Sequence, residues 1–189
     1  MNAITKTVEG QVINGIDVGA VQQLVEDISR NPKAAMTNWR VSTQWQGQTH
    51  SRTQIEGYSL GGQAIAREFT LEADEPFELC GTNRFPNPQE YLLAALNACM
   101  TVGYVAQCAL RGIVLEKLTI ETEGDLDLRG FLGLGDFNPG YDELSYTVTI
   151  KGNASEAEFA EVHAAVQATS PNFHNLARPV ALKAKLLVA

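Results

Sequence analysis

The fold of this chain is decided by the stretch NPQEYLLAALNACMTVGYVAQCAL, residues 87–110. Asn87 can cap a helix, Pro88 suits the first helical position, and Glu90 stands where a capping box needs an acid. The residues that follow are apolar on nearly every side of a helix, and Arg111-Gly112 marks its end. Because such a helix has almost no face to present to water, we expect it to lie buried in the middle of the protein.

This stretch must also be compared with a membrane span. The 20 residues from Tyr91 to Leu110 carry no charge, and a helix of this length could cross a bilayer. The run also contains Asn97, Thr101, Gly103 and Gln107, and it is richer in Ala than in Leu or Ile. The apolar strands that follow need a core element to pack on. We therefore expect a core helix and no membrane partner.

The rest of the chain has the order of an α+β fold. The predicted elements are a helix at 16–30 capped by Asp17, strands at 39–45, 52–58 and 65–71, strands at 114–121 and 144–150, helices beginning near Ser155 and Ser170, and a last strand at 180–188. Strands and helices do not alternate strictly. This order favours an α+β fold over a doubly wound parallel sheet.

Composition excludes one class of partner and suggests a compartment. With 14 Lys and Arg against 22 Asp and Glu, the net charge is −8, and a nucleic acid backbone would repel such a surface. Three cysteines are an odd number, and their spacing does not resemble a secreted disulfide framework. Met1 to Gly10 lacks the basic and apolar regions of a secretory signal. We expect a cytoplasmic protein.

The candidate nucleophile is Cys99, within the long helix. Its alternative role is that of a small core residue, because free cysteine is among the most buried residue types. A thiol reacts as the thiolate, and three turns into a helix the dipole contributes little, so an arginine from elsewhere would be required. Cys108, roughly 13 Å further along the helix, suits the core. Spacing assigns no role to Cys80.

No metal or cofactor site is expected. His50, His163 and His174 are scattered, and the sequence contains neither C-x-x-C nor H-E-x-x-H.

The segment Gly81-Thr-Asn-Arg-Phe-Pro-Asn-Pro-Gln-Glu-Tyr-Leu-Leu-Ala-Ala-Leu-Asn-Ala-Cys99-Met resembles the core motif of the OsmC family of osmotically inducible and organic hydroperoxide resistance (Ohr) proteins. The resemblance covers about residues 38–189, and the helix at 16–30 resembles an extension seen in one branch of that family. It implies an N-terminal helical extension, 1–37, and an OsmC-like domain, 38–189. It further implies an intertwined homodimer, with antiparallel sheets wrapped around long central helices.

The resemblance also implies thiol peroxidase chemistry. The family's peroxidatic cysteine falls on Cys99, and its activating arginine falls near Arg52. A guanidinium there would hold the thiolate and a peroxide oxygen, the thiolate would attack the O–O bond, and a sulfenic acid would form. An apolar pocket would favour organic hydroperoxides over hydrogen peroxide.

Two positions depart from the family pattern. The resolving cysteine of the family precedes a proline, and Ser170 stands there in this chain. The acidic partner of the arginine directly follows the motif proline, and Gln89 stands there. Glu90 points about 100° away around the helix, so it serves either as that acid or only as a cap. Reduction of Cys99 then requires an external thiol or Cys80.

Two functions of different classes follow. The first is a divergent, one-cysteine thiol peroxidase that reduces organic hydroperoxides in oxidative stress defence. The second is a non-catalytic protein that keeps the pocket and the dimer and binds an apolar small molecule. Retention of Cys99 and Arg52 favours the first function, whereas the residues found at Ser170 and Gln89 favour the second.

Overall fold

The computed structural model describes residues 10–188, which form two compact units. The units divide between Leu92 and Leu93, inside the long helix α2 (Pro88–Leu110). The first unit is dominated by an antiparallel sheet, and the second joins a two-stranded hairpin to helices. The predicted α+β class with antiparallel sheets is confirmed.

The first unit begins with a short hairpin and a helix. The elements are β1 (Val12–Ile13), β2 (Ile16–Asp17), α1 (Val18–Arg30) and the 3-10 helices η1 (Pro32–Ala35) and η2 (Phe77–Leu79), of which η2 follows the sheet. The carboxylate of Asp17 accepts a hydrogen bond from the amide of Ala20 at 3.0 Å, as predicted for the helix cap. The helix begins at 18 instead of 16, because residues 16 and 17 pair with β1.

The sheet of the first unit is centred on one long strand. Its strands are β3 (Thr37–Trp39), β4 (Ser42–Gly47), β5 (His50–Leu60) and β6 (Gln63–Ala73). β6 pairs along one edge of β5, while β3 and β4 pair with opposite ends of the other edge. The single strand predicted at 39–45 is therefore wrong. The chain leaves the ladder at Arg40 and Val41 and rejoins it as a second strand.

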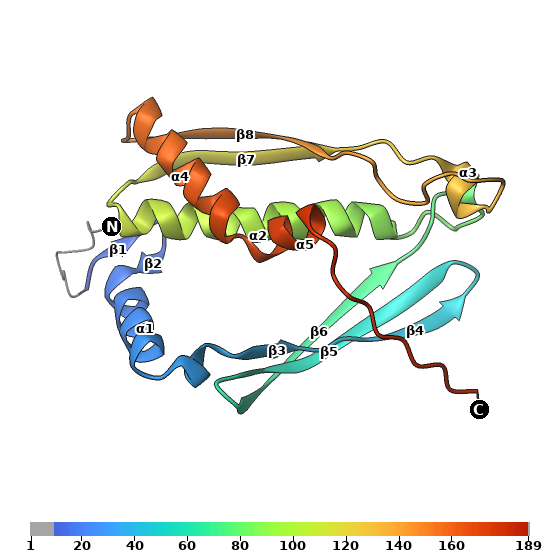
Figure 1. Ribbon diagram of the computed structural model, residues 1–189, viewed down its shortest axis with the longest axis horizontal. Helices are drawn as coiled ribbons and strands as arrows, with labels where there is room; N and C mark the ends of the chain where they lie inside the picture. The colour runs from blue at the N-terminus through green and yellow to red at the C-terminus, as the bar shows by residue number, and fades with distance from the viewer. Residues whose placement is uncertain (1–9, 189) are drawn as a thin grey trace. The chain divides into compact units, whose positions relative to one another are not determined.

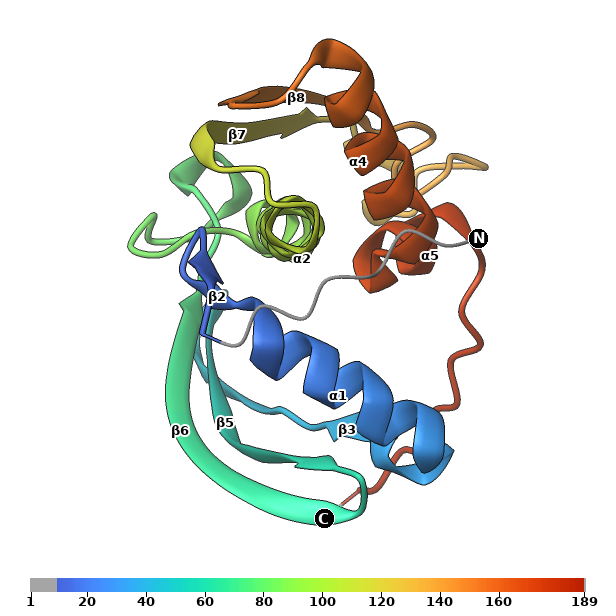
Figure 2. The ribbon, with the colours of Figure 1, turned by 90° about the vertical axis from the view of Figure 1, so that its left-hand side faces the viewer.

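A β-bulge sets the register between β5 and β6. The shift lies between Ile55 and Gly57, and it places Arg52 opposite Glu72. A Cβ atom on Gly57 would lie 2.6 Å from the carbonyl oxygen of Ile65, so the close approach of the two strands requires glycine. Figure 2 shows β5 and β6 curving together.

The connection from β6 to α2 is organised by the carboxylate of Asp74. This buried group accepts hydrogen bonds from the hydroxyl of Thr49 at 2.6 Å and from the amide and hydroxyl of Thr82 at 3.0 and 2.5 Å. These bonds hold the pKa of Asp74 well below its usual range. Gly81 fits so closely that a Cβ atom would lie 1.7 Å from the carbonyl oxygen of Glu75. The loop therefore enters α2 in one fixed conformation.

The second unit packs a hairpin and two helices beside α2. Its other elements are β7 (Leu115–Glu123), α3 (Leu128–Phe131), β8 (Ser145–Gly152), α4 (Glu156–Thr169) and α5 (Pro171–Ala177). β7 and β8 pair antiparallel, and Figure 1 shows them running alongside α2. The capping box predicted for α4 is confirmed, because Ser155 and Glu158 bond to each other's backbone amides.

The core of the second unit lies where α2 meets the hairpin and α4. Its buried residues are Leu96, Met100, Tyr104 and Cys108 of α2, Ile113, and Val162 and Val166 of α4. The four α2 residues recur every fourth position and so form one stripe along the helix. Apolar side chains of β7 and β8 pack against this cluster.

In the single chain, α2 is buried on one side and not on all sides. Val102 is 69% exposed, and Leu92 and Leu110 are also exposed, because neither the hairpin nor α4 covers that side. Within residues 10–188, α2 is the one helix long and apolar enough to cross a membrane. A helix in the core of a soluble protein meets the same criteria of length and composition.

The strand predicted at 180–188 is also wrong. This segment has no regular structure, and apolar side chains of its alternating pattern are exposed, Leu182 by 92%. A strand exists only where a neighbour completes its hydrogen bonds, and no described strand pairs with this segment.

Met100→Ala should lower the free energy of unfolding by about 2–5 kcal/mol, because it removes a fully buried side chain from the core. Met36 is 67% exposed, so Met36→Ala is the matched control, with an expected loss below about 1 kcal/mol. Urea denaturation followed by circular dichroism measures both values. Equal losses would contradict the location of the core given above.

Candidate functional site

Cys99 and Ser170 lie next to each other, although 71 residues separate them in the sequence. The hydroxyl of Ser170 donates a hydrogen bond to the sulfur of Cys99 at 3.4 Å. Ser170 is only 4% exposed, whereas Cys99 is partly exposed. A polar donor therefore stands beside the candidate nucleophile, at the position where the family resemblance expects a resolving cysteine.

The hydroxyl of Ser170 is held in place from both sides. Ser170 ends α4, where its amide donates to the carbonyl of Val166 at 2.8 Å. It also caps α5, where its hydroxyl oxygen accepts from the amide of Phe173 at 3.4 Å. Pro171 then occupies the first helical position. The junction of the two helices thus fixes the direction of the side chain.

Two asparagines hold the elements that surround this pair. Asn97 of α2 donates to the carbonyl of Ile120 at 3.2 Å and accepts from the hydroxyl of Thr122 at 2.5 Å, which ties α2 to β7. Asn172 donates to the carbonyl of Ala95 at 2.9 Å, which ties α5 to α2. A polar Asn97 in an apolar helix was the sequence signal for the first contact.

The three cysteines are all free, and their surroundings differ. Of the two cysteines in the second unit, Cys99 is the one whose sulfur accepts a hydrogen bond from a side-chain hydroxyl. Burial raises the pKa of the Cys108 thiol, which keeps it protonated and in the core as predicted. Cys80 is exposed at the end of η2, with a left-handed φ of 63°.

Arg52 lies in a polar network of the first unit. Its Nε donates to one oxygen of Glu72 at 2.9 Å, and Nε2 of His50 lies 2.5 Å from the other oxygen. The ring of His50 stacks on Phe85, with centroids 5.1 Å apart. Hydrogen bonds from His50 and Arg52 lower the pKa of Glu72, so this carboxylate is ionised at neutral pH.

The first turn of α2 contains Gln89, at the place where the resemblance expects the acid that pairs with Arg52, and the neighbouring Glu90. The carboxylate of Glu90 accepts from the amide of Asn87 at 2.7 Å, and the Asn87 side chain accepts from the amide of Glu90 at 2.8 Å. Glu90 thus completes the predicted capping box. Gln89 lies beside it and is partly exposed. The carboxylate that pairs with Arg52 is Glu72, which sequence reasoning missed.

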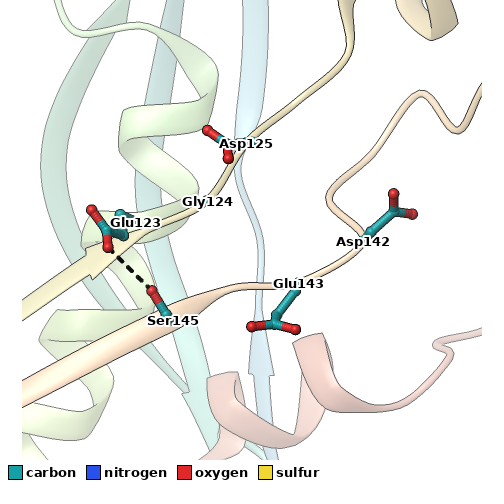
Figure 3. A pocket seen from close by; sticks show the side chains of 6 residues that line it. All are labelled: Glu123, Gly124, Asp125, Asp142, Glu143 and Ser145. Atoms are coloured by element: carbon teal, nitrogen blue, oxygen red, sulfur yellow. Dashed lines mark hydrogen bonds between the residues drawn. The ribbon is translucent and has the colours of Figure 1, made fainter.

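A separate cavity of about 470 Å³ lies at the open ends of β7 and β8. It is lined by Glu123, Gly124, Asp125, Asp142, Glu143 and Ser145. Figure 3 shows the carboxylates of Asp125 and Asp142 lying apart, and only Glu123 and Ser145 are joined by a hydrogen bond, at 3.4 Å. In the described part of the chain, no three His, Cys, Asp or Glu side chains are grouped to hold a metal ion. The residues that line this cavity include no cysteine and no basic side chain.

Comparison with solved structures finds three proteins that share the fold of this chain. They are an OsmC-like protein from Mycoplasma pneumoniae (19% identity, TM-score 0.55), a protein from Psychrobacter arcticus assigned provisionally to osmotic stress and detoxification responses (15%, 0.54), and an OsmC-like protein of unknown function from Vibrio cholerae (14%, 0.51). Each match covers 74% of this chain, and 87%, 87% and 93% of the other chain. The predicted OsmC-like fold is confirmed.

Comparison of the sequence with families and with curated proteins gives two results. No curated protein matches this chain significantly. The model of the OsmC-like protein family matches residues 81–185, which is more than half of the chain and includes both Cys99 and Ser170. The protein described here therefore belongs to the OsmC-like family.

Proposed function

We propose that this protein is a thiol-dependent peroxidase that reduces organic hydroperoxides through Cys99, as part of oxidative stress defence in the cytoplasm. The observation that carries the proposal is the hydrogen bond from Ser170 to the sulfur of Cys99. It gives the motif cysteine of an OsmC-like protein a donor that stabilises its thiolate. The resemblance assigns the activating cation to Arg52.

The proposed first step oxidises Cys99 by two electrons. The thiolate attacks the terminal oxygen of the hydroperoxide, an S–O bond forms, and the O–O bond breaks. The alkoxide that leaves takes up a proton and departs as the alcohol, so the sulfur becomes a sulfenic acid. Arg52 would stabilise the thiolate and the charge that develops on the leaving oxygen.

The second step returns Cys99 to the thiol. Ser170 has no sulfur, so the neighbour of Cys99 cannot form a disulfide with it. An external thiol attacks the sulfenic sulfur, water leaves, and a mixed disulfide forms. A second external thiol then displaces Cys99. Cys80 remains the internal candidate for the same role.

We further propose that the protein acts as a homodimer. One side of α2 exposes apolar residues, with Val102 at 69%, and the apolar pattern of residues 180–188 has no pairing strand. A second copy of the chain would cover this side of the helix and the exposed apolar side chains of residues 180–188.

One equivalent of cumene hydroperoxide should add one oxygen to the protein at Cys99, because residue 170 offers no resolving thiol. Intact-mass analysis with dimedone trapping and peptide mapping detects this product. Cys99→Ser should abolish the gain of oxygen, and Cys108→Ser should not. A loss of two hydrogens would instead indicate a Cys80–Cys99 bridge. No mass change at excess peroxide would favour the alternative function, non-catalytic binding of an apolar small molecule.

Ser170→Cys should convert the oxidised protein from the sulfenic acid to a disulfide between residues 99 and 170. The present O to S distance of 3.4 Å means that a small movement brings two sulfurs within bonding distance. Ser155→Cys is the matched control, since Ser155 also caps a helix of the second unit but is exposed. A Ser170→Cys protein that still accumulates sulfenic acid would show that these side chains do not meet in solution.

Sedimentation equilibrium at micromolar concentration should give twice the chain mass. Val102→Asp should shift the protein toward monomers, because it places a charge on the apolar side of α2 that the single chain leaves uncovered. A native protein that sediments as a folded monomer would rule out the dimer.

A further inference from the structure

The connection between β7 and β8 carries an apolar loop, residues 128–137, on the surface of the second unit. It consists of α3 and the residues that follow, and Figure 1 shows it at the open ends of the two strands. Five of its ten residues are large and apolar, and they are between 37% and 75% exposed: Leu128, Phe131, Leu132, Leu134 and Phe137. A cluster of this kind, unlike a single exposed apolar residue, is typical of a contact surface.

Local hydrogen bonds and close packing hold the apolar loop in one conformation. α3 ends in a Schellman motif, in which the amide of Leu134 donates to the carbonyl of Arg129 at 2.9 Å and Gly133 adopts a left-handed φ of 66°. A Cβ atom on Gly130 would clash with the carbonyl oxygen of Asn138, so the returning chain packs directly on α3. The apolar side chains therefore project from a structured loop.

The surroundings of the apolar loop are strongly negative. Residues 121–143 contain seven acids and a single base, Arg129. That base is already engaged, because its guanidinium pairs with Asp127 at 2.5 Å and lies 3.9 Å from the centre of the Phe137 ring. Six acids have no ion pair with another residue in the range 10–188: Glu121, Glu123, Asp125, Asp136, Asp142 and Glu143.

A cavity of about 320 Å³ joins the apolar loop to these acids. Its lining includes the ring of Phe137 and three carboxylates, those of Asp125, Asp127 and Asp142. Figure 3 shows the carboxylates of Asp125, Asp142 and Glu143 lying apart, so they do not converge on one ion. Separate carboxylates beside an apolar surface complement a partner whose cationic groups are spaced along a chain.

We propose that the apolar loop is a docking site for a basic amphipathic segment of another protein. The apolar side of that segment covers Phe131, Leu132 and Leu134, while its lysine or arginine side chains face the surrounding carboxylates. This proposal concerns the second unit alone and does not depend on the reaction proposed for Cys99.

The charge of the loop's surroundings argues against two other occupants. If two copies of the chain docked loop to loop, acids would lie opposite acids, which is repulsive. An anionic membrane surface would be repelled in the same way. A basic amphipathic segment meets both the apolar and the electrostatic requirement.

The test measures the binding of a defined probe to the full chain. The probe is a fluorescent peptide helix with leucine on one side and lysine on the other, and the control peptide has glutamate in place of lysine. Fluorescence anisotropy gives the dissociation constant, and ¹⁵N NMR shows which amides shift on binding. Circular dichroism verifies that each protein variant is folded.

Two sets of variants separate the apolar contribution from the electrostatic one. The apolar set is Phe131→Ser, Leu132→Ser and Leu134→Ser combined, and its matched control is Leu24→Ser with Val25→Ser, which changes exposed apolar side chains of α1. The charge set is Asp125→Asn with Asp136→Asn. Its matched control is Glu156→Gln with Glu161→Gln, exposed acids of α4.

The native protein should bind the lysine peptide and not the glutamate peptide, with amide shifts centred on residues 128–137. The apolar set should weaken binding by about tenfold or more, because it removes the buried centre of the contact. The charge set should weaken it by about threefold, and by less at high salt. Both control proteins should bind as the native protein does.

Three results would overturn the inference. Equal weakening by the loop variants and their controls would show only a general attraction between a basic peptide and an acidic protein. No binding of the lysine peptide, together with dissociation of the native assembly by the apolar set in sedimentation equilibrium, would make the loop a contact between copies of this chain. No binding of the peptide, together with binding of phosphatidylglycerol vesicles that the apolar set abolishes, would assign the loop to a membrane surface.

Discussion

α2 presents almost no polar side to water, and the second unit is arranged to cover it. A stripe of residues from Leu96 to Cys108 packs against α4 and the β7–β8 hairpin, while Val102 on another side stays exposed. Cys99 directly precedes the fully buried Met100 and lies at the border between these two sides. A thiol at such a border is shielded by the core and still reachable from outside. The position of the candidate nucleophile is thus a consequence of how the helix is covered.

The sequence predicts those elements whose signals are local. The capping boxes at Asn87 and Ser155, together with the cap at Asp17, identify three helix starts because each signal spans only three or four residues. The errors concern properties that depend on distant neighbours. Composition could not show which sides of α2 would be covered. Alternation at 180–188 shows that a segment can form a strand, but no described strand provides the hydrogen bonds that would make it one.

The residues of the candidate site also fall into those that the sequence identifies and those that only the structure shows. Motif position singles out Cys99, and the resemblance marks Ser170, whose contact with Cys99 only the structure shows. Glu72 was missed because the register of a long hairpin is not a local property. If the pairing of Leu60 with Gln63 continued without interruption, Arg52 would lie opposite Leu71. The bulge before Gly57 moves it opposite Glu72. A glycine in the middle of a predicted strand was the one signal of that shift.

The two departures from the family pattern have different chemical consequences. Arg52 pairs with the carboxylate of Glu72 on β6, so the arginine has an acidic partner although Gln89 carries no charge. Ser170 cannot replace sulfur in the same way. Its hydroxyl can donate a hydrogen bond to sulfur, but it cannot form a disulfide, so the proposed reaction would need a reductant other than residue 170. The demand on the reductant follows from this asymmetry. In the proposed reaction, a thiol from outside would reach Cys99 along the side of α2 that the core leaves open, and the partial exposure of Cys99 fits that route.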